Sequence, residues 1–390
     1  MPWQEVSIME QRREFVRLAG MEGSNRRELC RRFGISPQTG YKWLARWAEG
    51  DATLKDRSRR PEHSPRRTET ALEQEILRHR DAHPAWGARK IAALLKREKL
   101  APPAASTVHQ VLCRHERIMP PTGDAAATIR FERSSPNQLW QMDFKGWFRL
   151  ADEMRCEPLT VLDDHARYLL QLGACADQQM ATVRERLEGT FRCYGLPDGI
   201  FVDNGPPWGS SGGERWTRFT VWLLKLGVRV LFSRPYHPQS RGKIERLHRT
   251  MDIEVLSLWR PRDLADAQRA FDEWREIYNH QRPHEALGQE VPAKRYRPSL
   301  RPMPEKLAEP EYDEGDIVRR VGTTKAYIQF KGRQWPVGQA FFGERLAIRP
   351  RGADGHYGVF FGAFKVASID LTKPEGVHHV SEQVSTMSPD

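Results

Sequence analysis

The sequence predicts a multidomain protein in which two all-helical regions precede a mixed α/β domain and a small β-domain follows it. Helical hydrophobic patterns separated by turn residues occupy the first 118 residues. Residues 136–300 begin with three strand-like runs and continue with alternating helices and strands, which predicts a mixed sheet covered by helices. Residues 312–370 contain short alternating runs with glycine-bearing turns, as in a small β-barrel. A chain of 390 residues has room for two to three domains.

Composition narrows the class of protein. Hydrophobic residues make up 39% of the chain and charged residues 29%, and no apolar run approaches the roughly 20 residues that a spanning helix needs. The charged N-terminal residues are unlike a signal peptide. The five cysteines form no Cys-x-x-Cys pair, so we expect an intracellular protein with reduced thiols and without a disulfide framework or a zinc knuckle. These cysteines are Cys30, Cys113, Cys156, Cys175 and Cys193.

Positive charge is concentrated toward the N-terminus. Residues 1–135 carry 26 Lys and Arg against 17 Asp and Glu, residues 136–300 carry 24 against 22, and residues 301–390 carry 12 against 12. A concentrated positive field favours a polyanionic partner, because phosphates that bind Lys and Arg release condensed counterions. A basic but merely solvated surface is the alternative, so charge alone does not decide for nucleic acid.

Residues 1–50 are predicted to form a helix-turn-helix domain. A helix over 8–20 is followed by a second helix that ends near Gly34, and Ser36 and Pro37 supply the N-cap and first residue of a third. We expect its packed side to comprise Leu29, Phe33, Ile35, Tyr41 and Leu44. We expect its outer face to present DNA-reading side chains, namely Gln38, Thr39, Lys42 and Arg46. A purely structural helical hairpin is the alternative.

Two linkers and a tail are expected to lack regular structure. Residues 51–69 are rich in Pro, Arg and Ser without a hydrophobic period, which is typical of a flexible basic linker, with Arg59 and Arg60 as phosphate contacts. Residues 119–135 form a second linker rich in Pro, Gly and Ala, and residues 371–390 a disordered tail.

Residues 70–118 repeat the first architecture and predict a second helix-turn-helix domain. Helices are expected around Ala71–Arg80, after Trp86 and over Val108–Arg117. On the last helix, Val108, Val111 and Leu112 are expected to face inward. Its DNA-reading side chains are expected to be Ser106, His109, Gln110 and Arg114. His79 and His83 have the spacing of a zinc site, but without a Cys-x-x-Cys pair we favour ordinary surface histidines.

The middle region is expected to begin with a strand meander. Its second and third strands should pair as a hairpin around Asp163 and Asp164. The predicted elements are strands Leu139–Leu150, Cys156–Leu162 and Arg167–Cys175, helix Asp177–Tyr194, strand Gly199–Val202, helix Glu214–Leu226, strand Val228–Phe232 and a long helix from about Ser240.

Three acidic residues lie where folding alone would not place them. Asp143 lies within an apolar strand, where a carboxylate is costly to bury unless it is paired or bound to a metal. Asp203 ends a buried strand, where parallel strands deliver side chains into a crevice. Glu245 stands on the long helix, away from its apolar stripe. The stripe comprises Ile244, Leu247, Met251, Val255 and Leu258.

Each acid also has an ordinary structural explanation in a neighbouring residue. The alternatives are an ion pair of Asp143 with Lys145 or an arginine, an Asx turn of Asp203 with Asn204 and Gly205, and an i,i+4 pair of Glu245 with Arg241 or Arg249. We favour a shared function because all three explanations would have to hold at once. Asp163 and Asp164 are rival carboxylates, for which we favour a role in the hairpin turn.

Four motifs in this region resemble the integrase core of bacterial insertion-sequence transposases, the DDE group related to retroviral integrases. They are Trp140-x-x-Asp143, the strand end Phe201-Val-Asp203-Asn204-Gly205, the segment from Arg234 through Glu245 to Arg249, and Tyr278-Asn-x-x-Arg-Pro-His284-x-x-Leu287. The resemblance covers residues 136–300 closely and the general domain layout more loosely. The His-His-Cys-Cys zinc module of retroviral integrases is not found in this sequence.

The resemblance implies a ribonuclease-H-like core in which Asp143, Asp203 and Glu245 hold two Mg²⁺ ions, with Mn²⁺ as a substitute. It implies a transposase that cuts and joins DNA strands, acts on element ends and target DNA as at least a dimer, and works in the bacterial cytoplasm at the nucleoid. Substrate-gripping residues are expected to be Arg241, Lys243, Arg246 and Arg249, with His248 as a further contact. The β-domain would contact DNA or a sister subunit. An inactive DNA-binding relative, and a nuclease without joining activity, are the alternatives.

Overall fold

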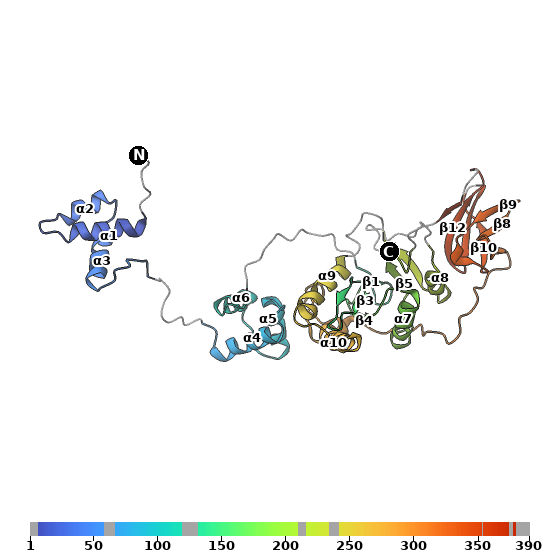
Figure 1. Ribbon diagram of the computed structural model, residues 1–390, viewed down its shortest axis with the longest axis horizontal. Helices are drawn as coiled ribbons and strands as arrows, with labels where there is room; N and C mark the ends of the chain where they lie inside the picture. The colour runs from blue at the N-terminus through green and yellow to red at the C-terminus, as the bar shows by residue number, and fades with distance from the viewer. Residues whose placement is uncertain are drawn as a thin grey trace. The chain divides into compact units, whose positions relative to one another are not determined.

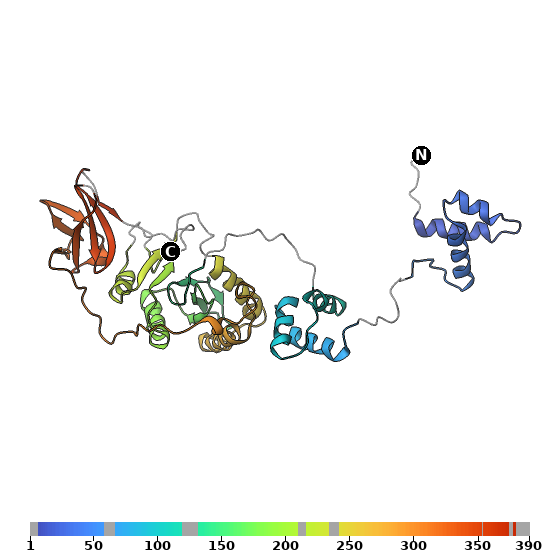
Figure 2. The same ribbon diagram turned by 180° about the vertical axis from the view of Figure 1, so that it is seen from behind.

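The computed structural model describes residues 7–57, 67–118, 132–209, 216–233, 242–352, 354–373 and 377–379. The chain divides into two compact units, Met1–Arg67 and Thr68–Asp390, whose elements are drawn from opposite sides in Figures 1 and 2. Within the described ranges, no helix combines the length and the apolar character that crossing a membrane requires.

The first unit has the predicted helix-turn-helix fold. Its helices are α1 (Ile8–Ala19), α2 (Arg26–Arg32) and α3 (Pro37–Ala48). Each of them begins with a side-chain cap, from Ser7, Asn25 and Ser36, which satisfies a backbone N–H that the helix leaves without a partner. The predicted N-cap at Ser36 is confirmed, since its hydroxyl accepts a hydrogen bond from the Thr39 N–H.

The packing of α3 differs from the prediction at one aromatic residue. Tyr41 was expected in the core but is 50% exposed, whereas Trp43 is buried. Gly40 and Trp43 lie three residues apart on one face of the helix, and Tyr41 lies on another. That face lies close to its neighbours, because a Cβ atom at Gly40 would lie 2.5 Å from the Cys30 Sγ atom.

The beginning of the predicted linker belongs to the first unit. Leu54 is fully buried in its core, and Arg12 donates to the Leu54 carbonyl at 2.9 Å and pairs with Asp56 at 2.9 Å. The expectation of a flexible segment from residue 51 was therefore wrong for residues 51–57, because Leu54 provides the hydrophobic anchor. Arg59 and Arg60 lie outside the described residues.

The second unit begins with three helices of the same kind. They are α4 (Thr70–Ala82), α5 (Ala88–Arg97) and α6 (Ala105–Arg114). Val108, Val111 and Leu112 are fully buried, as predicted, and pack with Trp86 and Ile91. The linker that follows is described only over 132–135.

A six-stranded mixed sheet forms the centre of this unit. Its strands are β1 (Trp140–Phe144), β2 (Phe148–Arg149), β3 (Arg155–Asp163), β4 (Leu169–Cys175), β5 (Gly199–Val202) and β6 (Arg229–Phe232). The order is β2-β3-β1-β5-β6, with β4 on β3. The predicted hairpin of β3 and β4 is confirmed, whereas the predicted first strand is split in two at Gly146, which has a φ of 95°.

Helices cover both faces of the sheet (Figure 1). On one face, Trp140 and Met142 share a core with α7 (Met180–Tyr194) and α8 (Arg218–Lys225). On the other face, Leu162 and Leu172 share a core with α9 (Gly242–Met251) and α10 (Leu264–Glu276). Successive residues of a strand point to opposite faces, so Gln141 and Asp143 point to the face that α9 covers.

The long helix changes its winding beyond α9. It continues as a π-helix, η2 (Asp252–Leu256), in which each turn contains more residues. The predicted apolar stripe therefore holds through Val255, but Leu258 is 59% exposed. After α10 come the π-helix η3 (Ile277–Gln281), the 3₁₀-helix η4 (Glu285–Leu287) and the short helix α11 (Pro292–Arg295).

The C-terminal domain consists of sheets that do not form a closed barrel within the described residues. Its strands are β7 (Ile317–Arg320), β8 (Tyr327–Phe330), β9 (Arg333–Pro336), β10 (Arg345–Pro350), β11 (His356–Phe361), β12 (Phe364–Asp370) and β13 (Val377–His379), with η5 (Gln339–Phe341). Five strands form one antiparallel sheet in the order β13-β12-β11-β10-β7, and β8 pairs with β9. Strand β13 lies in the tail that was expected to be disordered. That expectation was wrong for Val377–His379, because the backbone of β13 pairs with β12.

Candidate active site

The pairing of β1 with β5 brings two of the three acids to one edge of the sheet. The strands are parallel, with Trp140 opposite Ile200 and Gln141 opposite Phe201. Continued by two residues, this register places Asp143 beside Asp203, at the carboxyl ends of neighbouring strands. Alternation along β1 directs Asp143 to the face covered by α9. Asp203 lies just beyond β5, and its carboxylate accepts from the indole N–H of Trp208, which belongs to the core shared with α7 and α8. Asp143 is 8% exposed and Asp203 is half-buried.

Helix α9 carries the third acid across this face. The His248 ring nitrogen Nε2 lies 2.8 Å from the Thr160 hydroxyl, and that hydroxyl donates to the Asp143 carbonyl at 2.9 Å. Glu245 is one helical turn before His248 and therefore on the same side of α9. It is exposed, and in the part of the chain that the structure describes it forms no ion pair with Arg249.

A buried carboxylate fixes the start of α9 to the sheet. Asp164, fully buried, accepts hydrogen bonds from the Gln141 side chain at 2.8 Å and from the Lys243 ammonium at 2.5 Å. Gln141 is two residues before Asp143, and Lys243 is two residues before Glu245. Asp164 thus ties together the elements that carry two of the acids. It has an anchoring role beyond the turn that we expected, and the signal was a second buried acid beside Asp163.

Burial shifts the pKa values of two groups close to Asp164, namely Lys243 and Asp163. Burial lowers the pKa of Lys243 to about 8, although Asp164 acts in the opposite direction. Burial also raises the pKa of Asp163 to about 6, against the hydrogen bonds that it accepts from the Ala166 and Asn137 N–H groups. The bond from the Ala166 N–H confirms the turn role of Asp163. Lys243 was expected to grip substrate, but its side chain is 15% exposed and bound to Asp164, which makes it an internal contact.

The local contacts bear on the simpler explanations of these acids. Lys145 pairs with Asp252 at 2.6 Å, so its charge is matched on η2. One oxygen of Asp203 accepts from the Gly205 N–H at 3.0 Å and from the Trp208 indole N–H, so the Asx turn is present. Among the described residues, the three acids do not form a group whose ligand atoms all lie within 4.8 Å of one another.

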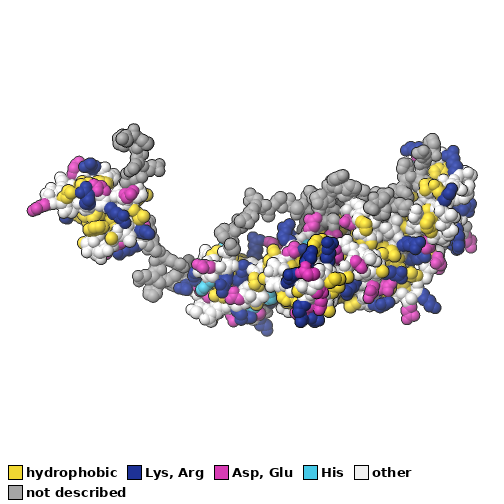
Figure 3. All heavy atoms as spheres, in the orientation of Figure 1, with side chains coloured by type: hydrophobic (Ala, Val, Ile, Leu, Met, Phe, Trp, Pro, Cys, Tyr) yellow, Lys and Arg dark blue, Asp and Glu magenta, His cyan; other side chains and the backbone are white. Residues whose placement is uncertain are grey.

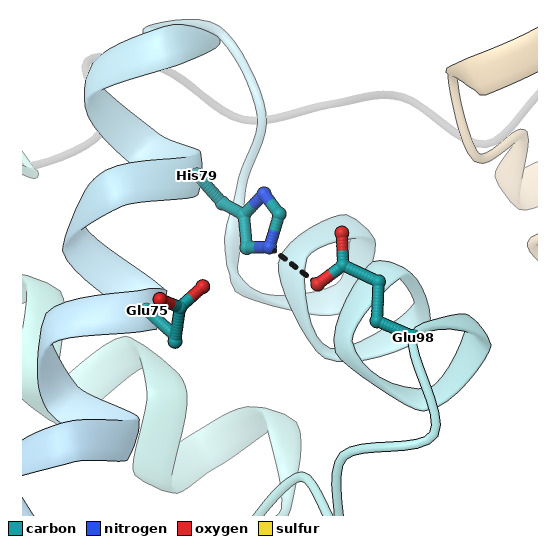
Figure 4. A group of neighbouring side chains, drawn as sticks. All are labelled: Glu75, His79 and Glu98. Atoms are coloured by element: carbon teal, nitrogen blue, oxygen red, sulfur yellow. Dashed lines mark hydrogen bonds and ion pairs between the residues drawn. The ribbon is translucent and has the colours of Figure 1, made fainter.

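A different group does meet that criterion, in the second helix-turn-helix region. Glu75 and His79 on α4 and Glu98 after α5 point toward one another, and His79 Nε2 lies 2.9 Å from the Glu98 carboxylate (Figure 4). His79 was expected on the surface but is 4% exposed. Arg78 lies 2.7 Å from Glu75 and 3.9 Å from Glu98. Its charge balances both acids, and the group is a structural link between α4 and α5.

His83, the other half of the suspected zinc pair, is not part of this group. Its ring stacks on Trp86 with centroids 3.8 Å apart, and burial lowers its pKa. The choice of ordinary histidines over a zinc pair is thus consistent with the contacts of both rings, although neither is a freely solvated surface residue.

The DNA-reading residues predicted on α3 fall into two groups. Gln38 and Lys42 are exposed. Thr39 lies 2.9 Å from the Ser36 hydroxyl at the N-cap, and Arg46 donates to the Lys55 carbonyl at 3.1 Å. Thr39 and Arg46 thus have contacts within the unit that the helical wheel did not reveal.

The predicted DNA contacts on α6 and α9 likewise divide into exposed side chains and side chains with internal partners. Ser106, His109 and Gln110 are exposed, but Arg114 pairs with the buried Glu73 at 2.5 Å, because it lies over the first turn of α4. On α9, Arg246 and Arg249 are exposed, and Arg241 lies outside the described residues. On the visible faces of the described residues, Lys and Arg are interspersed with Asp and Glu (Figure 3).

Comparison with protein families assigns most of the chain. Residues 133–238 and 226–292 match integrase core domains, and residues 316–376 match the C-terminal domain of IS481 family transposases. These matches identify integrase core domains and a C-terminal domain of the IS481 transposase type within the chain. Residues 11–62 match a helix-turn-helix domain and residues 39–112 a homeodomain-like domain.

Individual relatives cover the chain only in part. The chain is 30% identical over 160 residues to an uncharacterized protein of insertion element IS476 from Xanthomonas euvesicatoria, a match over 41% of this chain and 44% of the relative. It is 21% identical over 253 residues to a putative transposase of insertion sequence element IS5376 from Geobacillus stearothermophilus, over 63% of this chain and 62% of the relative. The chain thus spans about half the length of these relatives.

One solved structure is also similar to the chain. It is a simian T-cell lymphotropic virus intasome in complex with the PP2A regulatory subunit B56 gamma, with 17% identity and a TM-score of 0.37. The alignment covers 76% of this chain and 97% of that chain.

Proposed function

We propose that this protein is a transposase that cuts and joins DNA strands at a divalent-metal site formed by Asp143, Asp203 and Glu245. The observation that supports the proposal is the parallel register of β1 and β5, which, continued by two residues, aligns Asp143 with Asp203, together with the contact of His248, one turn after Glu245, with the Thr160 hydroxyl. The integrase core match supports the same assignment.

The donor set suits hard cations. Three carboxylates offer oxygen ligands, and Mg²⁺ binds through few carboxylates while retaining water and substrate phosphates. Two bound Mg²⁺ ions would activate an attacking oxygen and stabilise the leaving one in an in-line displacement at phosphorus. Mn²⁺ is expected to substitute. Use of both Asp203 oxygens requires that the Trp208 indole release the one that it now holds.

The chain's own residues would organise the substrate around these acids. Arg246 and Arg249, exposed on the helix of Glu245, would hold the DNA backbone beside the acids. The two helix-turn-helix regions would contact the element end through Gln38 and Lys42 and through Ser106, His109 and Gln110. Because two ends must be cut and joined in concert, the active form is proposed to be at least a dimer on DNA.

Substitution of one acid tests this function. With a labelled duplex that carries the DNA flanking the reading frame, and a supercoiled plasmid as target, wild type should give nicked donor and donor joined to plasmid in Mg²⁺. Asp143→Asn should reduce both products to background while the affinity for the duplex is retained. Glu185→Gln, an exposed acid on α7, is the matched control and should retain activity.

The products separate the alternatives. A nuclease without joining activity would give nicked donor alone, and an inactive DNA-binding relative would bind without either product. Equal activity of Asp143→Asn and wild type would contradict the assignment of the site.

A further inference from the structure

A cleft of about 580 Å³ lies between the second helix-turn-helix region and the segment that follows η3. Three parts of the Thr68–Asp390 unit line it. The start of α5 contributes Arg89 and Lys90, α6 contributes Ser106 and His109, and the segment around η4 contributes Glu285 and Gln289. Two of the residues predicted to read DNA therefore share this cleft with residues that the sequence did not single out.

Lys90 leaves the cleft with an unmatched positive charge. The acid in the lining, Glu285, is matched by Arg89 at 2.5 Å. In the described parts of the chain, half-buried Lys90 has neither an ion pair nor a hydrogen bond. Burial lowers its pKa, and the nearby Arg282 acts in the same direction, whereas Glu254 and Glu285 act against them. A partly desolvated ammonium without a partner gains most from an anion.

The backbone adds to the same preference. The N-caps of α5 and α6 are Gly87 and Ala104, and neither supplies a side-chain hydrogen bond. The first turns of both helices line the cleft, through Ala88 and Ala105. Uncapped N–H groups at the positive end of a helix favour negative charge, so these termini reinforce the effect of Lys90.

Basic side chains extend from this cleft toward α9. Arg282, paired with Glu254 at 2.9 Å, and Arg246 both contribute with Lys90 to lowering the pKa of His284, for which burial is the first cause. Lys90, Arg282 and Arg246 are therefore close enough to act electrostatically on one ring. Arg246 follows Glu245 directly on α9, and Glu254, the partner of Arg282, lies among these cations.

We propose that this cleft binds a backbone phosphate of the DNA substrate, with Lys90 as its charged contact and with Ser106 and His109 as hydrogen-bond partners. This inference rests on the proposed function in one respect, namely that DNA is the substrate. It does not depend on the assignment of the three acids. It adds to the recognition surface of α6 a phosphate contact that fixes the position of the duplex relative to the core.

The salt dependence of DNA binding tests the proposal. The full chain is titrated with a fluorescent duplex in EDTA at several salt concentrations, and log K is plotted against log salt. Each lost phosphate contact should reduce the slope by about 0.9. We expect this reduction for Lys90→Gln and none for Lys96→Gln, which removes an exposed cation of the same helix outside the cleft.

A second variant separates binding from folding. Ser106→Glu places an anion in the cleft at the first turn of α6, where an acid stabilises a helix. It should weaken duplex binding without lowering the melting temperature. Competition by inorganic phosphate, equal in wild type and Lys90→Gln, would contradict a phosphate site, as would unchanged salt slopes in both proteins. Because EDTA removes divalent metal, this binding test does not depend on strand joining. Loss of strand joining would therefore contradict the proposed function alone, and unchanged salt slopes would contradict the phosphate site alone.

Discussion

The two helix-turn-helix regions have the same three-helix plan but begin their helices differently. In the first, the side chains of Ser7, Asn25 and Ser36 cap all three N-termini. In the second, the N-caps are Glu69, Gly87 and Ala104, and none of them donates or accepts through its side chain. Since a side-chain cap is typically worth about 1 kcal/mol, local stabilisation is much greater in the first region.

The hydrophobic cores of the two helix-turn-helix regions also differ in how far they depend on residues of the region itself. The first is closed by residues of its own unit, including Phe15, Trp43 and Leu54. The second also packs against Ile277 of η3, and Arg97 donates to the Gln281 carbonyl at 2.7 Å. Most helical stability in proteins comes from tertiary packing. The comparison therefore indicates that the second region has exchanged local caps for contacts with the core, which leaves its helix termini open to a ligand.

Removing one tryptophan from each region should give the largest contrast. Trp43→Ala and Trp86→Ala each remove a buried indole, at a cost of about 3–5 kcal/mol. We expect Trp43→Ala to abolish amide protection in α1–α3 alone. Trp86→Ala should reduce protection in α4–α6 and also in η3. Hydrogen exchange measured by mass spectrometry resolves the two patterns, and loss confined to α4–α6 would contradict the dependence on the core.

Sequence reasoning succeeded where local signals determine the structure. The Ser-Pro start of α3, the hairpin of β3 and β4 and the inward face of α6 all follow from capping, turn residues and periodicity. It failed where a helix deviates from the regular period or where packing decides. The π-helix η2 displaced Leu258, and the close approach at Gly40 selected Trp43 over Tyr41.

The same distinction applies to the candidate site. Asp143 and Asp203 could be proposed from strand patterns, because parallel strands end at one edge. The contact of Lys243 with Asp164 could not, since it joins residues 79 positions apart and a helical wheel shows only that Lys243 is polar. Likewise Lys90 had no distinguishing pattern, because its significance depends on a cleft formed by three separate segments.

Acid should distinguish the second unit, Thr68–Asp390, from the first by a smaller amount. Burial holds the pKa of His284 well below its ordinary value of 6.5, whereas the described residues of the first unit contain no histidine. Below pH 6.5 the unfolded chain takes up a proton that the folded chain does not. Stability of the second unit should therefore fall by up to about 1.4 kcal/mol per pH unit for this group.

His284→Phe provides the control for that effect. The phenyl ring can retain the edge contact with Tyr278, whose ring centroid lies 4.8 Å from that of His284, and it cannot titrate. Urea unfolding at pH 6.5 and pH 5.5 should show a smaller loss of stability in the variant than in wild type. An equal loss would assign the acid sensitivity to other groups.

Exchanging the capping pattern should give the smallest effect and the most direct test of the comparison. Ser36→Ala removes the bond to the Thr39 N–H and should cost about 1 kcal/mol, whereas Ala104→Asp should supply a cap to α6 and gain a similar amount. The gain should come with weaker duplex binding, because the new carboxylate satisfies N–H groups at the cleft. Calorimetry and anisotropy measure the two effects, and a stabilised variant with unchanged affinity would show that the open helix ends do not contribute to binding.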